Sequence, residues 1–160
     1  MAKATSADRA GNMADRLTKA QRSFIMSRIR RRGNRSTELA LVKLFRKHRV
    51  SGWRRHAKLP GSPDFVFHKQ RVIVFADGCF WHSCSRCRLT PRSRAYWRRK
   101  LRTNVARDKL VNKTLMEAGW VVVRIWEHLL AQQPAVAVQR IVHTLNRRSA
   151  LVSSNSGTVK

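Results

Sequence analysis

Apolar and polar positions along the chain follow two different periods. Apolar residues recur every three to four positions, as on one face of a helix, in four segments: 18–32, 37–48, 95–118 and 134–146. Short and nearly continuous apolar runs, typical of buried strands, occupy three further segments: 65–68, 71–77 and 120–126. The resulting order is helix, helix, strand, strand, helix, strand, helix. This order predicts a small α/β domain with a mixed sheet.

The segments outside this pattern are polar and predict disorder at both ends. Residues 1–12 are expected to form a disordered leader, and the serine-rich residues 147–160 a disordered tail. Residues 13–146 are then expected to form a single domain of ordinary size. The sequence shows no apolar run of about 18 residues and no signal-peptide pattern, so we expect a cytoplasmic location and no membrane partner.

Charge is the unusual feature of the composition. Lys and Arg number 35 against 8 Asp and Glu, which gives a formal net charge of +27. Self-repulsion on this scale favours a polyanionic partner, and nucleic acid is the default. The protein is therefore expected to associate with the nucleoid of a bacterium. In a chain so poor in acids, each retained carboxylate is a candidate for a specific role.

Three cysteines and one histidine predict a metal site. Cys79, Cys84 and Cys87 cluster in one loop, which is a poor disulfide framework. His128 follows the last apolar run. Three thiolates and one imidazole suit a tetrahedral structural zinc ion, which would fix the loop after one strand to the end of another. The alternative is three free thiols and a surface histidine.

A second candidate metal site centres on Asp64. This residue follows Pro63 and opens the first short strand, near the predicted end of the next strand at Ala76 and Asp77. Mg²⁺ prefers oxygen ligands from carboxylates, backbone carbonyls and phosphate. Asp64 is therefore a candidate ligand for a hard cation such as Mg²⁺. The alternative is an ordinary turn aspartate next to proline.

His82 and Asp108 form a candidate catalytic pair. If zinc already has four ligands, His82 is free to act as a general base on water; otherwise it is a fifth ligand or a packing residue. Asp108 lies on the apolar stripe of helix 95–118, where an unpaired acid is costly. A histidine partner would resolve this cost, because an Asp–His pair orients and stabilises an imidazolium. The alternative is an intrahelical pair with Arg107 or Lys109, or a salt bridge elsewhere.

Three aromatic residues, Phe80, Trp81 and Trp97, lie in or beside the most basic part of the chain. Aromatic side chains within a basic surface insert between bases and unstack them. This arrangement predicts contact with nucleic acid. The alternative is that all three side chains belong to the core.

Four stretches resemble one known family: PDFVF, VFADGCFWHSC, YWRRKLRTNVARDKL and GWVVVRIWEH. They look like the very short patch repair endonucleases, which are bacterial DNA mismatch endonucleases with a restriction-endonuclease-like fold. The resemblance covers about Met13 to Leu130. It implies a mixed β-sheet flanked by helices. It also implies that one DNA strand is nicked 5′ to the thymine of a T:G mismatch. Deamination of 5-methylcytosine produces such a mismatch.

By motif, the resemblance implies a Mg²⁺-dependent active site. Its catalytic residues would be Asp64, His82, Asp108 and Glu38. Asp64 would bind Mg²⁺ with the Ala76 backbone carbonyl, and Asp77 is a further candidate for the metal or the phosphate. The histidine would activate the attacking water with Asp108 as its partner, and Glu38 would complete the metal–water network.

The same resemblance implies the zinc site and the DNA contacts. The zinc ligands would be Cys79, Cys84, Cys87 and His128. The DNA-contacting residues would be Phe80, Trp81, Trp97, Arg28, Arg30, Arg92 and Arg94. The aromatic side chains would wedge into the duplex beside the mismatch, and helix 18–32 would grip DNA as a basic arm. One departure is that the second strand lacks the lysine of the (D/E)-x-K pattern, which is common in the wider superfamily.

The main hypothesis from the sequence is a Mg²⁺-dependent DNA mismatch endonuclease. It would act as a monomer on duplex DNA that carries a T:G mismatch, and mismatch-repair proteins are candidate further partners. Two alternatives stay open at this point. One is a restriction-like nuclease without mismatch preference, and the other is a non-catalytic, zinc-stabilised DNA-binding protein.

Overall fold

The computed structural model describes residues 20, 24, 32–87 and 95–155. The chain divides into two compact units, residues 1–33 and 34–160. In the first unit, Ala20 and Phe24 are helical. Arg32, the last residue of the predicted helix over 18–32, lies in a bend, and the rest of that segment, including Arg28 and Arg30, lies outside the described residues, as does the predicted leader.

The second unit is built on a four-stranded mixed sheet with the order β1-β2-β3-β4. The strands are β1 Trp53–Arg55, β2 Phe65–Phe67, β3 Val72–Asp77 and β4 Val121–Trp126. β2 pairs antiparallel with both β1 and β3, whereas β3 and β4 are parallel. The sequence did not predict strand β1, because Trp-Arg-Arg contains no apolar run. Only the pairing of this segment with β2 identifies it as a strand.

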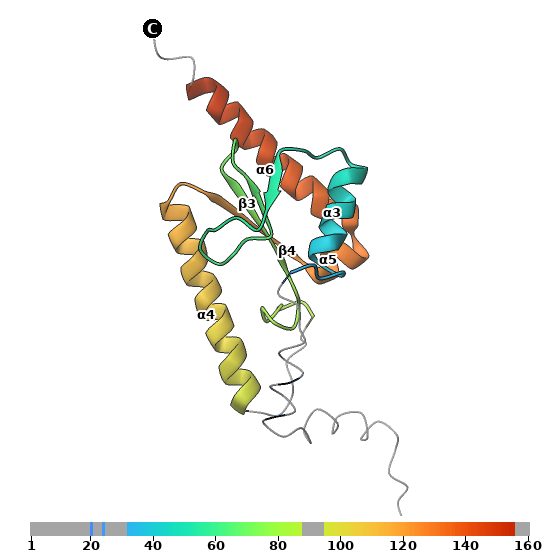
Figure 1. Cartoon of the computed structure of the whole chain (residues 1–160), viewed down its shortest axis with the longest axis vertical. Helices are drawn as coiled ribbons and strands as arrows, with labels where there is room; N and C mark the ends of the chain where they lie inside the picture. The colour runs from blue at the N-terminus through green and yellow to red at the C-terminus, as the bar shows by residue number, and fades with distance from the viewer. Residues whose placement is uncertain (1–19, 21–23, 25–31, 88–94, 156–160) are drawn as a thin grey trace, which may run out of the picture. The chain divides into compact units, whose positions relative to one another are not determined.

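Four helices in the described part of this unit cover the two faces of the sheet (Figure 1). They are α3 Glu38–Lys47, α4 Ala95–Glu117, α5 Glu127–Gln132 and α6 Pro134–Asn155. α4 lies on one face and α3, α5 and α6 lie on the other. The prediction of a mixed α/β domain is therefore confirmed. Among the described residues, no helix has both the length and the apolar character needed to cross a membrane.

Side chains alternate along β2 and β3 between two separate cores. On the α3, α5 and α6 face, Phe65 and Val74 pack with Phe45 and other apolar residues of the helices. On the α4 face, Ile73 and Leu115 belong to a smaller core. Because both faces are covered, the strands need apolar residues at nearly every position, which explains the continuous runs in the sequence.

Helix α6 corrects the expected disordered tail. The sequence predicted that the helix ends at residue 146, but α6 continues to Asn155. Arg148 Nε donates a 3.1 Å hydrogen bond to the carbonyl of Gln70 in the turn between β2 and β3, and Ser149 lies 3.5 Å from the Gln70 amide. The serine-rich composition concealed this tertiary contact. Residues 156–160 lie outside the described residues.

Because of the strand pairing, the carboxyl ends of β3 and β4 and the first residue of β2 lie at the same end of the sheet, which is called the site edge below. β3 and β4 are parallel and in register from Val72 with Val121 to Asp77 with Trp126, so both carboxyl ends lie there. β2 runs antiparallel to β3, so its first residue lies at the same edge. The loop after β3, the start of α5 and Asp64 are therefore brought together by pairing alone.

Gly61, in the turn before β2, is pressed against α4 and the sheet. Its φ is +76°, and a Cβ added there would lie 2.5 Å from Val111 Cγ1 and 3.2 Å from the Phe75 ring. We expect Gly61→Ala to lower the free energy of unfolding by about 3 kcal/mol, because overpacking adds to the strain of a left-handed residue. Urea unfolding measures the loss.

Gly52→Ala is the matched control for this substitution. Gly52 has a φ of +83°, but nothing lies within 4 Å of a Cβ added there. Only the conformational part of the loss, about 1 kcal/mol, is expected at this position. Equal losses in the two variants would contradict the close packing of the Gly61 turn.

Candidate active site

Asp64 lies where β2 begins and β3 ends. Its Oδ2 accepts a 2.8 Å hydrogen bond from the backbone N–H of Ala76. The antiparallel register pairs Phe65 with Val74, which sets Asp64 beside the last residues of β3. The structure thus brings together Asp64 and Ala76, which the sequence assigned to one site.

The surroundings of Asp64 disfavour its ionised form. Burial raises the pKa of Asp64 from 3.8 to about 6. The hydrogen bond from Ala76 and the charge of His82 lower the pKa, whereas the carboxylates of Glu38 and Asp77 raise it. A half-buried carboxylate whose pKa is raised by nearby carboxylates is stabilised by a cation, and its oxygen atoms suit a hard divalent ion.

His82 and Asp108 are in direct contact. His82 Nδ1 and Asp108 Oδ2 lie 2.6 Å apart, although the two residues come from the loop after β3 and from α4. The structure therefore confirms the predicted contact between them. The alternative partner, Arg107, lies farther away, with its Nη2 3.8 Å from Asp108 Oδ1, and its side chain is mostly exposed.

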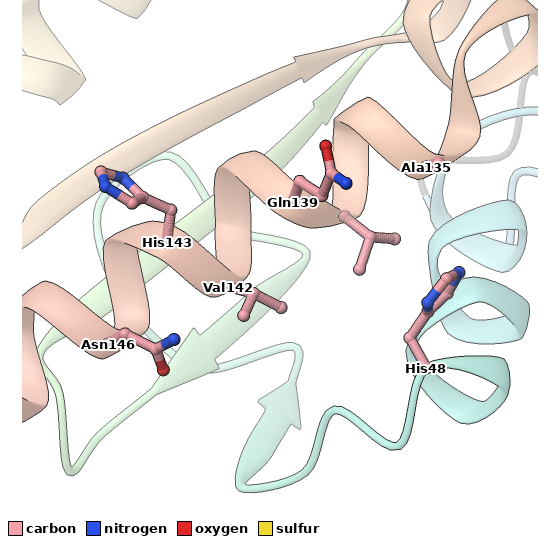
Figure 2. A pocket seen from close by; sticks show the side chains of 7 residues that line it. His48, Ala135, Gln139, Val142, His143 and Asn146 are labelled. Carbon is pink, nitrogen blue, oxygen red and sulfur yellow. The ribbon is translucent and has the colours of Figure 1, made fainter.

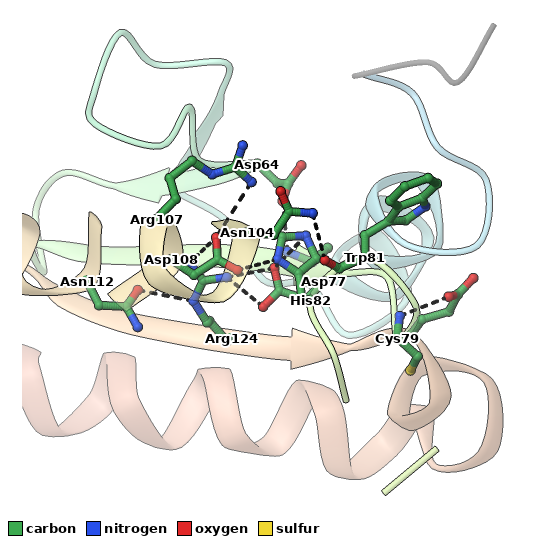
Figure 3. Close-up of polar contacts among 12 residues, drawn as sticks. Asp64, Asp77, Cys79, Trp81, His82, Asn104, Arg107, Asp108, Asn112 and Arg124 are labelled. Atoms are coloured by element: carbon green, nitrogen blue, oxygen red, sulfur yellow. Dashed lines mark hydrogen bonds and ion pairs between the residues drawn. The ribbon is translucent and has the colours of Figure 1, made fainter. Parts of the chain in front are cut away.

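Arg124 connects the carboxylates around His82 (Figure 3). Its Nη1 donates to both oxygens of Asp77, at 2.9 and 2.8 Å, and its Nη2 lies 3.5 Å from Asp108 Oδ1. The second ring nitrogen of His82, Nε2, lies 3.7 Å from Asp77 Oδ1. Asp77 is thus a buried, arginine-bound carboxylate beside the histidine. Its candidate role as a metal or phosphate residue stays a prediction.

Glu38 is buried at the first position of α3 and forms an ion pair. Arg55 Nε, on β1, donates a 2.8 Å hydrogen bond to Glu38 Oε1, and Nη2 of the same arginine also contacts that oxygen. His56 Nε2 lies 3.4 Å from it. The sequence did not predict this pair, because β1 itself was not predicted. Glu38 nevertheless lies near enough to Asp64 to influence its pKa.

The loop after β3 is held from several sides. Within it, Cys84 N–H donates to the Cys79 carbonyl at 2.9 Å. Asn104 Nδ2, on α4, donates to the Trp81 carbonyl at 3.0 Å, and Cys79 N–H donates to Glu127 Oε2 at 3.3 Å. The loop is therefore anchored to α4 and to α5, and it presents His82 in a fixed position.

The three aromatic residues form one half-buried cluster. The ring centroid of Phe80 lies 4.9 Å from that of Trp81 and 5.3 Å from that of Trp97, and the two tryptophans are 6.0 Å apart. Each side chain is partly accessible to solvent. The cluster is neither a fully buried core nor a set of isolated surface rings, so it offers an apolar surface that is braced by its own packing.

The predicted zinc ligands also meet in space. Ligand atoms of Cys79, Cys84, Cys87 and His128 all lie within 4.8 Å of one another. His128 Nδ1 is 3.2 Å from Cys79 Sγ and 3.5 Å from Cys84 Sγ. Burial raises the pKa of the Cys79 thiol to about 12, so metal binding there would have to displace a proton. Three sulfur atoms and one ring nitrogen at these short separations fit a metal ion with tetrahedral coordination.

A basic groove of about 920 Å³ runs beside α4, close to the loop that carries His82. Its lining includes Ser83 and four basic residues: Arg98, Arg99, Arg102 and Lys109. The sequence did not assign these basic residues to DNA contact, and the arginines of this region that it did assign, Arg92 and Arg94, lie outside the described residues.

A second hollow, of about 490 Å³, lies between α3 and α6 (Figure 2). His143, on α6, and His48, directly after α3, border it. His48 follows the last residue of α3, at the other end of that helix from Glu38. This hollow is therefore separate from the group around Asp64.

The sequence did not predict several residues that the structure places at the site. Arg124 looks like a polar interruption of an apolar strand, and nothing nearby in the chain indicates its partners. Asn112 is bound by Arg124 Nε at 3.1 Å, and Asn104 and Glu127 anchor the loop. Asn104, Arg124 and Glu127 belong to stretches that carry the family resemblance, which was the available signal for them.

Comparison with known proteins places this chain among DNA endonucleases. A family model described as DNA mismatch endonuclease Vsr matches residues 14–89. The type II nicking enzyme V.NaeI of Lentzea aerocolonigenes is 47% identical over 85 residues, and this match spans about half of each protein, 52% of this chain and 51% of V.NaeI.

Two further relatives match over most of their length. The type II nicking enzyme V.XorIIP of Xanthomonas oryzae pv. oryzae is 38% identical over 120 residues, which cover 72% of this chain and 85% of the relative. The DNA mismatch endonuclease Vsr of Escherichia coli K12 is 36% identical over 117 residues, which cover 72% of this chain and 74% of the relative.

Asp64→Asn should stabilise the Mg²⁺-free protein in a pH-dependent way. The pKa of Asp64 is raised on folding, so ionisation of this side chain lowers the free energy of unfolding. This loss is absent below pH 3.8, grows as the pH rises, and is complete above about pH 6. Well above that pH, we expect the variant to exceed the parent by about 2 to 3 kcal/mol in unfolding free energy. Near pH 4 the difference should shrink.

Chemical unfolding of both proteins at the two pH values measures this difference. Asparagine keeps an oxygen for the Ala76 N–H, so the hydrogen bond itself is preserved. Added Mg²⁺ should reduce the difference at the higher pH. A difference that is the same at both pH values would refute the raised pKa.

Proposed function

We propose that this chain, which belongs to the DNA mismatch endonuclease Vsr family, nicks one strand of duplex DNA 5′ to the thymine of a T:G mismatch. As a member of this family the chain is a DNA endonuclease, and hence a hydrolase. This membership removes the alternative of a non-catalytic DNA-binding protein. The mixed sheet flanked by helices supports a restriction-endonuclease-like fold.

One observation carries the proposal: Asp64, His82 and Asp108 come from three different segments and gather at the site edge. A candidate metal ligand and a histidine with a carboxylate partner are the groups that phosphodiester hydrolysis requires. They lie beside a basic groove, as a DNA substrate needs. Action at DNA also supports a location with the nucleoid. Monomeric action and contact with mismatch-repair proteins stay predictions from the sequence.

Mg²⁺ is the proposed catalytic cofactor. Asp64 would hold it, and the Ala76 carbonyl would add a ligand, because the N–H and C=O of one residue in a strand point to the same side. Glu38 and Asp77 contribute negative charge nearby. When bound, Mg²⁺ would supply Lewis-acid stabilisation of the charge that develops on the phosphate.

His82 is proposed to accept the proton of the attacking water. With Nδ1 engaged by Asp108, the lone pair of the neutral imidazole lies on Nε2, where it takes the proton as the water oxygen attacks phosphorus. The Asp108 carboxylate then stabilises the imidazolium. The new bond joins oxygen to phosphorus, and the bond from phosphorus to the 3′ oxygen breaks. The products are a 3′-hydroxyl, once that oxygen gains a proton, and a 5′-phosphate.

The aromatic cluster is proposed to open the duplex beside the mismatch. Phe80, Trp81 and Trp97 present partly exposed rings on the loop that carries His82 and on α4. Insertion of such rings unstacks a base step at a cost of a few kcal/mol, and this cost is lower next to a mispair. The basic side chains of the α4 groove would bind the backbone phosphates.

The names of several relatives favour a second candidate function. V.NaeI and V.XorIIP are described as type II nicking enzymes, not as mismatch endonucleases. A nuclease of the same fold that nicks duplex DNA without mismatch preference would use the same Asp64 and His82. Cleavage of a matched duplex at the same rate as a mismatched one would favour this second function.

Strand nicking of an end-labelled duplex with one T:G mismatch tests the main proposal. We expect Mg²⁺-dependent nicking 5′ to the mismatched thymine, with no nicking in EDTA and little in the matched T:A duplex. Asp64→Ala should abolish nicking but retain DNA binding, because it removes the metal ligand and leaves the basic groove intact.

Glu117→Ala is the control for Asp64→Ala. Glu117 is exposed, and its ion pair with Lys113 lies on the surface of α4. It should nick at the parental rate. Loss of binding in Asp64→Ala to the same extent as loss of nicking would count against the catalytic assignment.

Zinc is the proposed occupant of the Cys79, Cys84, Cys87 and His128 group. We expect about one zinc ion per chain by atomic absorption, because three thiolates and one imidazole complete a tetrahedral shell. Cys84→Ala should lower the zinc content and the unfolding temperature together, since the ion joins the loop after β3 to α5.

His143→Ala is the control for the zinc prediction. His143 is exposed on α6 and lies outside the cysteine group. This variant should keep the parental zinc content. A parental chain that is purified without zinc, and that gains no stability from added zinc, would refute the assignment.

A further inference from the structure

We infer that Arg124 is a positioning residue of the active site, one that fixes His82 through the two carboxylates on either side of it. The inference rests on the proposed function, because it assigns a role to His82 in the same reaction. Arg124 would touch neither the DNA nor the metal. It would act by setting the places of Asp77 and Asp108.

The guanidinium of Arg124 is held on every side. Its Nε donates to Asn112 Oδ1 at 3.1 Å, on α4, and its plane lies over the Phe75 ring with 4.6 Å from Cζ to the ring centroid. Its two terminal nitrogens face Asp77 and Asp108 (Figure 3). The arginine side chain is only 17% exposed. A planar group bound in this way has one orientation, which it imposes on its partners.

Those partners are the groups that flank His82. Asp108 contacts Nδ1 at 2.6 Å, and Asp77 lies 3.7 Å from Nε2. Two carboxylates with little exposure repel each other, and the cation that both of them face in this network is Arg124. Without it, the carboxylates would separate or take up other partners. The imidazole would then lose the orientation in which Nε2 is presented to water.

Register explains why arginine occupies this position. β4 pairs in parallel with β3, and Arg124 lies opposite Phe75, two residues before Asp77. A long side chain from that point reaches past the strand end to Asp77 and across to Asp108 on α4. A lysine has the charge but lacks the fork that reaches Asn112, Asp77 and Asp108 together.

Arg124→Gln is the first variant to test. In a single-turnover assay with saturating enzyme, we expect nicking of the T:G duplex to fall by about 10²-fold, because a small displacement of a catalytic group has that effect. The dissociation constant for the duplex should not change, since Arg124 lies outside the basic groove. Arg124→Lys should give a rate between those of Arg124→Gln and the parent.

Arg71→Gln is the matched control. Arg71 also lies over an aromatic ring, 4.8 Å from the Trp120 centroid, and its Nε donates to the carbonyl of Gly119, two residues after the end of α4. Its contacts do not include the site carboxylates. We expect a loss of stability in Arg71→Gln with nicking at the parental rate.

The double variant Asp77→Asn with Arg124→Gln separates positioning from charge neutralisation. Removal of both charges avoids an uncompensated buried carboxylate, so the unfolding temperature should recover relative to Arg124→Gln alone. Nicking should stay low, because the contact to Asp108 is still missing. Recovery of parental nicking in this double variant would overturn the inference.

An NMR readout decides the inference without reference to activity. The His82 Nδ1–H proton, bonded to Asp108, should give a slowly exchanging downfield resonance in the parent and in Arg71→Gln, and this resonance should be lost in Arg124→Gln. Its persistence in Arg124→Gln would overturn the inference. If the parent showed the resonance but nicked no duplex, the proposed function would fail, and the effect of Arg124→Gln on the resonance would still decide the positioning role.

Discussion

Parallel pairing of β3 with β4 is the constraint on which the rest of the structure depends. Two parallel neighbours need a crossover connection, and here α4 supplies it and covers one face of the sheet. The pairing sets both carboxyl ends at the site edge. It therefore brings the loop after β3 next to the start of α5, where Cys79 meets His128. It also sets Arg124 within reach of Asp77. Both the candidate metal group and the candidate catalytic group depend on this one register.

Few acids are present, and the structure buries several of them beside cations or hydrogen-bond donors. Asp77 is paired with Arg124, Glu38 with Arg55, and Asp108 with His82. Burial of a charge without a partner costs several kcal/mol, so each pairing is a condition for placing that acid near the site. Asp64 differs from these three, because a backbone N–H and nearby carboxylates surround it and its pKa is raised. That contrast marks Asp64 as the position where an external cation is most favourable.

The two functions proposed for the loop after β3 require opposite properties, and the structure provides both. A histidine that moves a proton must be held within a few tenths of an ångström, whereas rings that enter DNA must be accessible. Backbone bonds inside the loop, the Asn104 anchor and the cysteine group provide rigidity at its base. The rings of Phe80 and Trp81 support each other at its surface. The strong positive charge of the chain can then draw DNA towards the loop over a distance set by ionic strength.

The sequence by itself determined the parts of this protein whose signals are local. Apolar runs predicted β2, β3 and β4, and helical periodicity predicted α3, α4 and most of α6. Cysteine spacing predicted the metal group, and one inward-facing acid, Asp108, predicted a histidine partner. Tertiary structure alone decided β1, α5, the extension of α6 to Asn155, and the partners of Arg124 and Glu38. The physical reason is that each of these depends on contacts between segments far apart in the chain. A pattern within a few residues shows which groups are available, but strand register shows which of them meet.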